Sequence, residues 1–177
     1  MESLETRDLM AGDVSAQVIN GNLIITGDAA DNKITITQVS STSYRIRGQD
    51  TTINGRQAAT FVVSNNVRIS MLGGNDVVTI GTPTGSPTTL KRDLSINMGG
   101  GRDTINVYSS RVRNVTLKLG GGADKVNFAG SITVTGVIDA DGGAGTDRAT
   151  QAASTFFSVD PSKPHRLANF EIENTPF

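Results

Sequence analysis

The chain has 177 residues and a mass of 18.5 kDa, which fits one domain or one short array of repeats. Its formal net charge is −1, and this balance argues against nucleic acid or an anionic membrane as a partner. It has no cysteine, so disulfides and thiolate metal sites are excluded, and no apolar run approaches the ~20 residues that span a bilayer.

Glycine is enriched and falls mainly in the turns of an internal repeat. Residues 94–107 and 115–128 each contain an alternating strand, a Gly-Gly-Gly turn closed by Asp, and a second alternating strand. The closing residues, Asp103 and Asp124, are 21 positions apart. Repetition at intervals of 20 to 50 residues predicts a solenoid.

Further copies precede and follow this pair, with the closing residues Asn32, Asp76 and Asp147. The 27-residue interval before Asp103 is explained by a polar, proline-containing insertion, 81–89, which we expect to be a surface loop. Asn20-Gly21 carries a hairpin-type signal. Residues 44–63 alternate weakly, and we expect another rung there without an acidic turn.

Units of 21 to 27 residues with two or three short strands fit one turn of a parallel β-helix. The sequence therefore predicts an all-β fold over residues 14–177, a parallel β-helix (solenoid) of about six rungs with Gly-Gly-x-x-Asp turns. The alternative is an antiparallel sandwich, which also has short strands at regular spacing. A sandwich, however, requires no repeated glycine turn at matching positions.

Residues 1–13 differ from the rest, because they are charged and lack the apolar stretch of a signal peptide. One interpretation is an N-terminal cap over the first rung. The other rests on Leu4-Glu5-Thr6-Arg7-Asp8-Leu9-Met10-Ala11, which resembles the Leu-Glu-x-Arg-x-Leu-Leu-Ala segment of the LEPR-XLL family of secreted or surface planctomycete proteins. Met10 replaces the second Leu, and the usual basic leader is missing. The resemblance implies a sorting-type segment, a longer precursor and an extracellular or cell-surface location.

The turn-closing acids are the strongest candidates for a functional site. Residues two and four positions after each of the first three Asp are apolar, and side chains alternate along a strand, so the Asp should face inward with them. The neighbouring Arg102, Lys125 and Arg148 should then point outward. Two carboxylates ~5 Å apart repel by about 1 kcal/mol in water and by several kcal/mol at an effective dielectric of ~20. Something must compensate for this repulsion.

Calcium is one candidate, because it takes oxygen ligands at ~2.3–2.6 Å, about half the rung spacing. Residues 142–150 resemble the RTX, or haemolysin-type, calcium-binding nonapeptide Gly-Gly-x-Gly-x-Asp-x-(apolar)-x. Residues 99–107 and 120–128 are one position short of it, and RTX arrays repeat every nine residues, so the likeness covers the turns alone. The resemblance implies that the acidic turns supply calcium ligands, and Asp139 and Asp141, just before the best match, are added to them. The predicted ligands are Asp76, Asp103, Asp124, Asp139, Asp141 and Asp147.

The alternative needs no metal. Each Asp would accept hydrogen bonds from the N–H groups of its own glycine turn, an Asx-type closure.

Catalysis has little support in the residues. His165 is the one histidine and lies in a proline-flanked tail, and Gly-x-Ser-x-Gly, P-loop and His-x-x-x-His motifs are all missing. Arg111 and Arg113 offer a base such as β-helix polysaccharide lyases use beside calcium. Those enzymes carry long loops that wall a groove, and 81–89 is the one substantial loop here.

The sequence therefore favours a non-catalytic structural or adhesive module of a secreted or cell-surface protein, with either Ca²⁺ or Asx-type closure in its acidic turns. Its expected partners are a cell-surface polymer or other surface proteins. The extracellular assignment comes from the two resemblances. One alternative is a carbohydrate-binding or polysaccharide-cleaving β-helix protein. Another is an interaction module that associates end to end through uncapped rungs.

Overall fold

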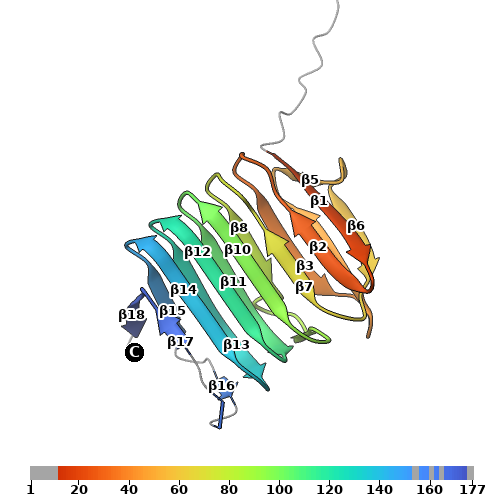
Figure 1. Cartoon of the computed structure of the whole chain (residues 1–177). Coiled ribbons are helices and arrows are strands. Elements are labelled where there is room, and N and C mark those ends of the chain that lie inside the picture. The colour runs from red at the N-terminus through yellow and green to blue at the C-terminus, as the bar shows by residue number, and fades with distance from the viewer. Residues whose placement is uncertain (1–11, 153–155, 160–161, 164–165, 175–177) are drawn as a thin grey trace, which may run out of the picture.

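The computed structural model describes residues 12–152, 156–159, 162–163 and 166–174, and every regular element in this part of the chain is a β-strand (Figure 1). The first sheet has the order β17-β14-β12-β10-β7-β2-β1-β5. Its strands are β1 (Gly12–Ile19), β2 (Asn22–Thr26), β5 (Thr51–Ile53), β7 (Val67–Ser70), β10 (Leu94–Gly100), β12 (Val115–Gly122), β14 (Ile138–Gly145) and β17 (Arg166–Ala168).

The second sheet has the order β18-β15-β13-β11-β8-β3-β4-β6. Its strands are β3 (Lys33–Gln38), β4 (Ser43–Gly48), β6 (Ala58–Val62), β8 (Val77–Ile80), β11 (Thr104–Val112), β13 (Lys125–Val134), β15 (Arg148–Gln151) and β18 (Glu171–Asn174). Two further short strands lie beside it: β9 (Thr88–Thr89) pairs with β11, and β16 (Phe156–Val159) pairs with β13.

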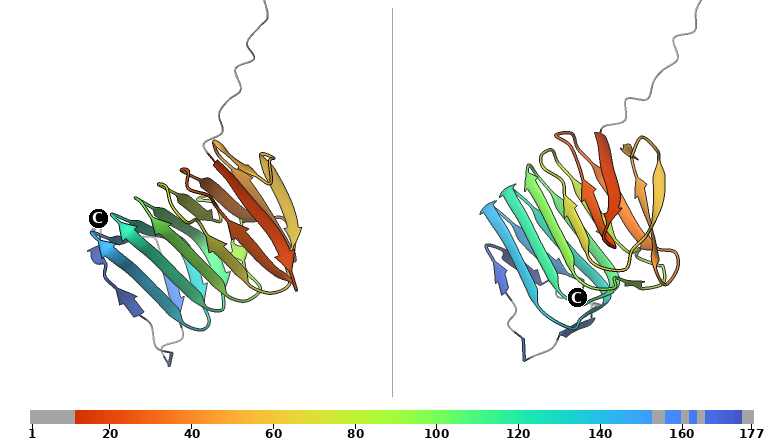
Figure 2. Two further views of the ribbon diagram at one scale, coloured as in Figure 1. Left: turned by 45° about the horizontal axis from the view of Figure 1, so that its top comes forward. Right: turned by 45° about the vertical axis from the view of Figure 1, so that its right-hand side comes forward.

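The chain alternates between the two sheets, so each circuit forms one turn of a β-solenoid (Figure 2). The strand pairs β7/β8, β10/β11, β12/β13 and β14/β15 stack in parallel and in register. These make about four regular turns, where the sequence predicted about six, and the pairs β2/β3 and β17/β18 extend the parallel pairing at the two ends. The predicted parallel β-helix is confirmed.

Alternation along each strand places the core between the sheets. In β10, Leu94, Ile96 and Met98 are buried while Ser95 and Asn97 face outward. The same columns continue from turn to turn as Val, Ile, Leu and Met, and they form one aliphatic cluster. Burial of this apolar area is the main favourable term in folding.

Antiparallel strands close the N-terminal end of the stack. β1 pairs with β2 across Asn20-Gly21, whose positive φ angles of 49° and 75° are those of a hairpin turn. β4 pairs antiparallel with β3, and β6 with β4. The rung expected at 44–63 is therefore wrong, since these strands cover the first turn instead of adding another. Residues 1–11 of the predicted N-terminal segment lie outside the described residues, and β1 already includes Gly12 and Asp13.

The insertion at 81–89 lies at the surface, as expected, and ends in β9. β9 pairs with the part of β11 that follows an irregularity between Tyr108 and Ser110. The fully buried Tyr44 donates its hydroxyl to the main-chain oxygen of Thr89 at 2.5 Å, which fastens the insertion to β4.

The glycine turns share one length. Gly99, Gly120 and Gly143 lie opposite one another in register. The turns that appeared one residue shorter than the RTX nonapeptide therefore have the same length as the last turn. Gly120 has a φ of 104°, and an added Cβ would lie 1.9 Å from the main-chain oxygen of Gly99. Gly121 has no atom within 4 Å of an added Cβ, and its partner in the next turn is Ala144.

Adjacent glycines should therefore respond differently to the same substitution. We expect Gly120→Ala to lower the free energy of unfolding by about 2 kcal/mol or more, because it combines a positive φ with a main-chain clash. Gly121→Ala should change it by about 0.5 kcal/mol or less. Urea denaturation of the two variants measures the difference, and equal losses would contradict the turn geometry.

Candidate functional site

The four turn-closing acids form a single buried column at the corner where the chain passes from the first sheet to the second. Asp76, Asp103, Asp124 and Asp147 are each at most 2% exposed, and Asn32 begins the column with no exposure. Each residue directly precedes a strand of the second sheet, and those strands are in register. The inward-facing column predicted from strand parity is present, and the neighbouring Arg102, Lys125 and Arg148 are exposed as expected.

Each carboxylate links its own turn to the turn before it. The main-chain N–H of Asn32 donates to Oδ1 of Asp76 at 2.8 Å, and that of Asp76 donates to Oδ1 of Asp103 at 2.8 Å. The series continues from Asp103 to Asp124 at 2.8 Å and from Asp124 to Asp147 at 2.9 Å. The column is therefore a ladder of four side-chain bonds along the solenoid axis.

The ladder differs from the own-turn closure considered as the alternative to calcium. The acceptor of each main-chain N–H is a carboxylate 21 to 44 residues further along the chain. Own-turn bonds of the Asx type do occur, but at other acids: Asp28 accepts from the N–H of Ala30, and Asp141 from that of Gly143. For the four column acids, own-turn closure is wrong.

The second carboxylate oxygen has no partner. Oδ2 of Asp76, Asp103, Asp124 and Asp147 is buried without a hydrogen bond. A charge that is buried without a partner is costly in a protein interior.

Burial accordingly raises the pKa values of Asp76, Asp103 and Asp124. For Asp76, desolvation is the largest cause and the charge of Asp103 adds to it, which raises the pKa to about 7 even though the N–H of Asn32 opposes the change. Desolvation and the charge of Asp124 raise the pKa of Asp103 to about 6. Desolvation also raises the pKa of Asp124. Protonation thus relieves part of the repulsion that the sequence analysis identified.

The last turn differs in what lies beside its carboxyl group. Met71, Met98 and Leu119 occupy one column of the first sheet and are fully buried, and the pairing register places Gly142 next in that column. A Cβ added to Gly142 would lie 2.8 Å from Oδ2 of Asp147 and 2.2 Å from the main-chain oxygen of Asn169. Glycine therefore makes room for two oxygen atoms that a larger side chain would displace.

The other two predicted ligands lie elsewhere. Asp139 and Asp141 face outward from β14, where Arg166 contacts them at 3.1 and 2.9 Å, and Asn169 donates to Asp141 at 2.7 Å. The amide of Asn169 and the guanidinium of Arg166 lower the pKa of Asp141. Within the described ranges, no three acidic or histidine side chains come together as a metal-binding group. His165 lies outside those ranges.

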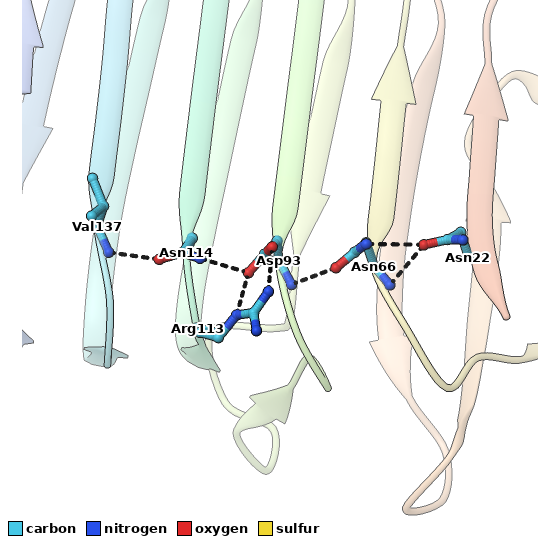
Figure 3. A network of polar contacts seen from close by, with 6 residues as sticks. All are labelled: Asn22, Asn66, Asp93, Arg113, Asn114 and Val137. Carbon is cyan, nitrogen blue, oxygen red and sulfur yellow. Dashed lines mark hydrogen bonds and ion pairs between the residues drawn. The ribbon is translucent and has the colours of Figure 1, made fainter.

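A second polar column at the opposite corner was missed by the sequence analysis (Figure 3). Its side chains lie where successive strands of the first sheet begin, and the main-chain N–H of Val137 ends the series: Asn22, Asn66, Asp93 and Asn114. Asn66 donates to Oδ1 of Asn22 at 3.0 Å, and Asn114 donates to Asp93 at 2.9 Å and accepts from the N–H of Val137 at 2.8 Å. The signal was an Asn or Asp directly before the first apolar residue of β2, β7, β10 and β12.

Comparisons of this chain with protein-family models, with curated proteins and with solved structures give no match. The fold alone defines the class, a β-solenoid. The described part of the chain contains no helix with the length and apolar character needed to cross a bilayer.

The column makes stability depend on pH in a defined direction. A carboxyl whose pKa is raised on folding stabilises the native state below its unfolded pKa of ~3.9, and this stabilisation is lost as the pH rises through the folded value. We therefore expect the melting temperature to fall between pH 5 and pH 8. Asp76→Asn should reduce that fall by raising the melting temperature at pH 8, since an amide is uncharged and Asn32 already occupies an equivalent position.

The matched control is Asp50→Asn, which makes the same chemical change at an exposed position between β4 and β5. A melting temperature of Asp76→Asn that follows the parent protein at both pH values would contradict the assignment.

Proposed function

We propose that this protein is a non-catalytic structural or adhesive β-solenoid module of an extracellular or cell-surface protein. The observation that carries the proposal is that the column acids bond to the main chain of the neighbouring turn and hold the stack together. Their chemistry is thereby used inside the molecule, and the outer faces of the sheets remain for contact with a partner. The extracellular location rests on the two family resemblances.

Arg113, one of the two arginines considered for lyase chemistry, supports the same proposal. Arg113 forms a two-pronged contact with Asp93, with both nitrogen-to-oxygen distances at 2.7 Å. That contact raises the pKa of the Arg113 guanidinium, which makes it a poor proton acceptor. Arg113 therefore serves as a link between adjacent turns, as Figure 3 shows.

Adhesion can be tested with beads that carry the folded protein. We expect such beads to be retained on intact cells of the source organism more than beads that carry Gly120→Ala, which we expect to destabilise the fold. Protease added to intact cells should also remove an epitope tag from the native protein while a cytoplasmic marker stays protected. Equal retention of the two bead types, together with a protected tag, would overturn the proposal.

We propose calcium as a ligand of one carboxyl group, that of Asp147, and not of the whole column. Oδ2 of Asp147 is buried and has no hydrogen bond, and the missing side chain of Gly142 lets this oxygen and the main-chain oxygen of Asn169 approach the same point. Calcium prefers carboxylate and carbonyl oxygens of this kind. The three earlier carboxyl groups have Met71, Met98 and Leu119 in the place of Gly142.

A ligand that binds only the native state raises the melting temperature. We expect millimolar calcium to raise it relative to excess chelator, and we expect Asp147→Asn to abolish the rise while Asp124→Asn preserves it. Identical melting curves of the parent protein with calcium and with chelator would contradict the calcium proposal. The proposal of a structural or adhesive module would not be affected.

A further inference from the structure

The outer side of the second sheet carries a row of exposed cations. Lys33 lies on β3, Arg45 and Arg47 on β4, Lys125 on β13 and Arg148 on β15, and all five side chains are exposed. We call these five residues the basic face. Glu171 of β18, 3.8 Å from Arg148, is the acid of this side that has a described side chain.

The outer side of the first sheet has a different composition. Its cations are balanced by an equal number of acids, and two of the three cations lie close to an acid. Arg166 contacts both Asp139 and Asp141, and Lys118 lies opposite Asp141 in register. The charged side chains of this face are Arg68, Lys118, Arg166, Asp13, Asp139 and Asp141. The two faces of one solenoid therefore differ in charge.

The basic face has little internal compensation. Among the residues that the structure describes, Lys33, Arg45, Arg47 and Lys125 have no ion-pair partner within 4.0 Å. Arg45 and Arg47 are ~7 Å apart along one strand, and Lys125 and Arg148 occupy adjacent strands at ~4.8 Å spacing. Like charges at such distances repel, so an anion that spans them would bind favourably.

The formal charge of the whole chain does not reveal the excess of cations on its surface. Four of its 17 acidic residues are the buried Asp of the column, so 13 acids are left against 16 Lys and Arg. The near-neutral sequence charge, which argued against anionic partners, thus describes the outer surface poorly.

Uncharged hydrogen-bonding groups run between the cations. Thr35, Thr79, Asn106 and Asn127 lie in register in one column beside Arg47. Asn127 donates to Asn106 at 2.8 Å, and this contact fixes the orientation of both amides. Tyr108, half-buried on the same side, is the aromatic residue of this face among the described side chains.

We propose that the basic face binds a linear acidic polysaccharide through its carboxylate groups. The cations match the charges of such a chain, and the Thr and Asn column offers partners for its hydroxyl groups. Single-stranded nucleic acid would instead require several aromatic side chains on which bases stack. This inference rests on the proposed adhesive function and assigns the surface and the partner chemistry.

The test uses polygalacturonate as the probe, with its fully methyl-esterified form as a neutral control of the same backbone. We expect the full chain to bind polygalacturonate with an affinity that falls as NaCl is raised, since exposed charges are screened. The double variant Arg47→Thr/Lys125→Thr should weaken binding by about 10-fold or more, and Arg68→Thr/Lys118→Thr, with the same charge change on the other sheet, by about 3-fold or less.

Equal melting temperatures of the two double variants would show that both fold. The proposal is overturned if both lose affinity equally, if the esterified polymer binds as well as the acid, or if single-stranded DNA competes as strongly as polygalacturonate. Bead adhesion that persists while polygalacturonate fails to bind would reject this face and partner and would leave the adhesive function standing.

Discussion

The structure depends on how each turn satisfies the main-chain N–H group at the corner between the two sheets. A buried N–H without an acceptor costs about 1–3 kcal/mol, and the glycine turn offers no backbone acceptor at that point. The carboxylate of the following turn supplies it, as when Asp124 accepts from the N–H of Asp103 at 2.8 Å. The main-chain oxygen of Asp103 in turn accepts from Lys125, so side-chain and main-chain bonds run along the same axis.

The two polar columns show how position changes the behaviour of one residue type. Asp103 lies inside the stack, where desolvation raises its pKa to about 6. Asp93 lies at the half-exposed opposite corner, where the guanidinium of Arg113 and the amide of Asn114 hold its pKa below the usual range. Both acids connect adjacent turns. Folding favours the protonated form of the inner acid, Asp103, and the charged form of the outer acid, Asp93.

Much of this architecture could be predicted from the sequence because two patterns are regular. Apolar residues alternate with a period of two along each strand, and the glycine turns recur about every 22 residues. Parity alone placed Asp76 and Asp124 inside, since both precede residues that must be buried. The direction of their bonds could not be predicted, because it depends on which turn lies next to which. The antiparallel cap was missed because the weak alternation of apolar residues at 44–63 is compatible with a parallel rung and with an antiparallel hairpin. Asn114 was missed because an Asn before a strand is an ordinary turn residue.

The most direct test of the ladder is a titration of the individual Asp carboxyl carbons by nuclear magnetic resonance. The account predicts that Asp76 titrates at a pH of about 7 and Asp103 at about 6, while the half-buried Asp141, paired with Arg166 and Asn169, titrates below its usual range. If Asp76 and Asp103 titrate near 4, as solvated carboxyl groups do, the column is not buried as described and the account is wrong.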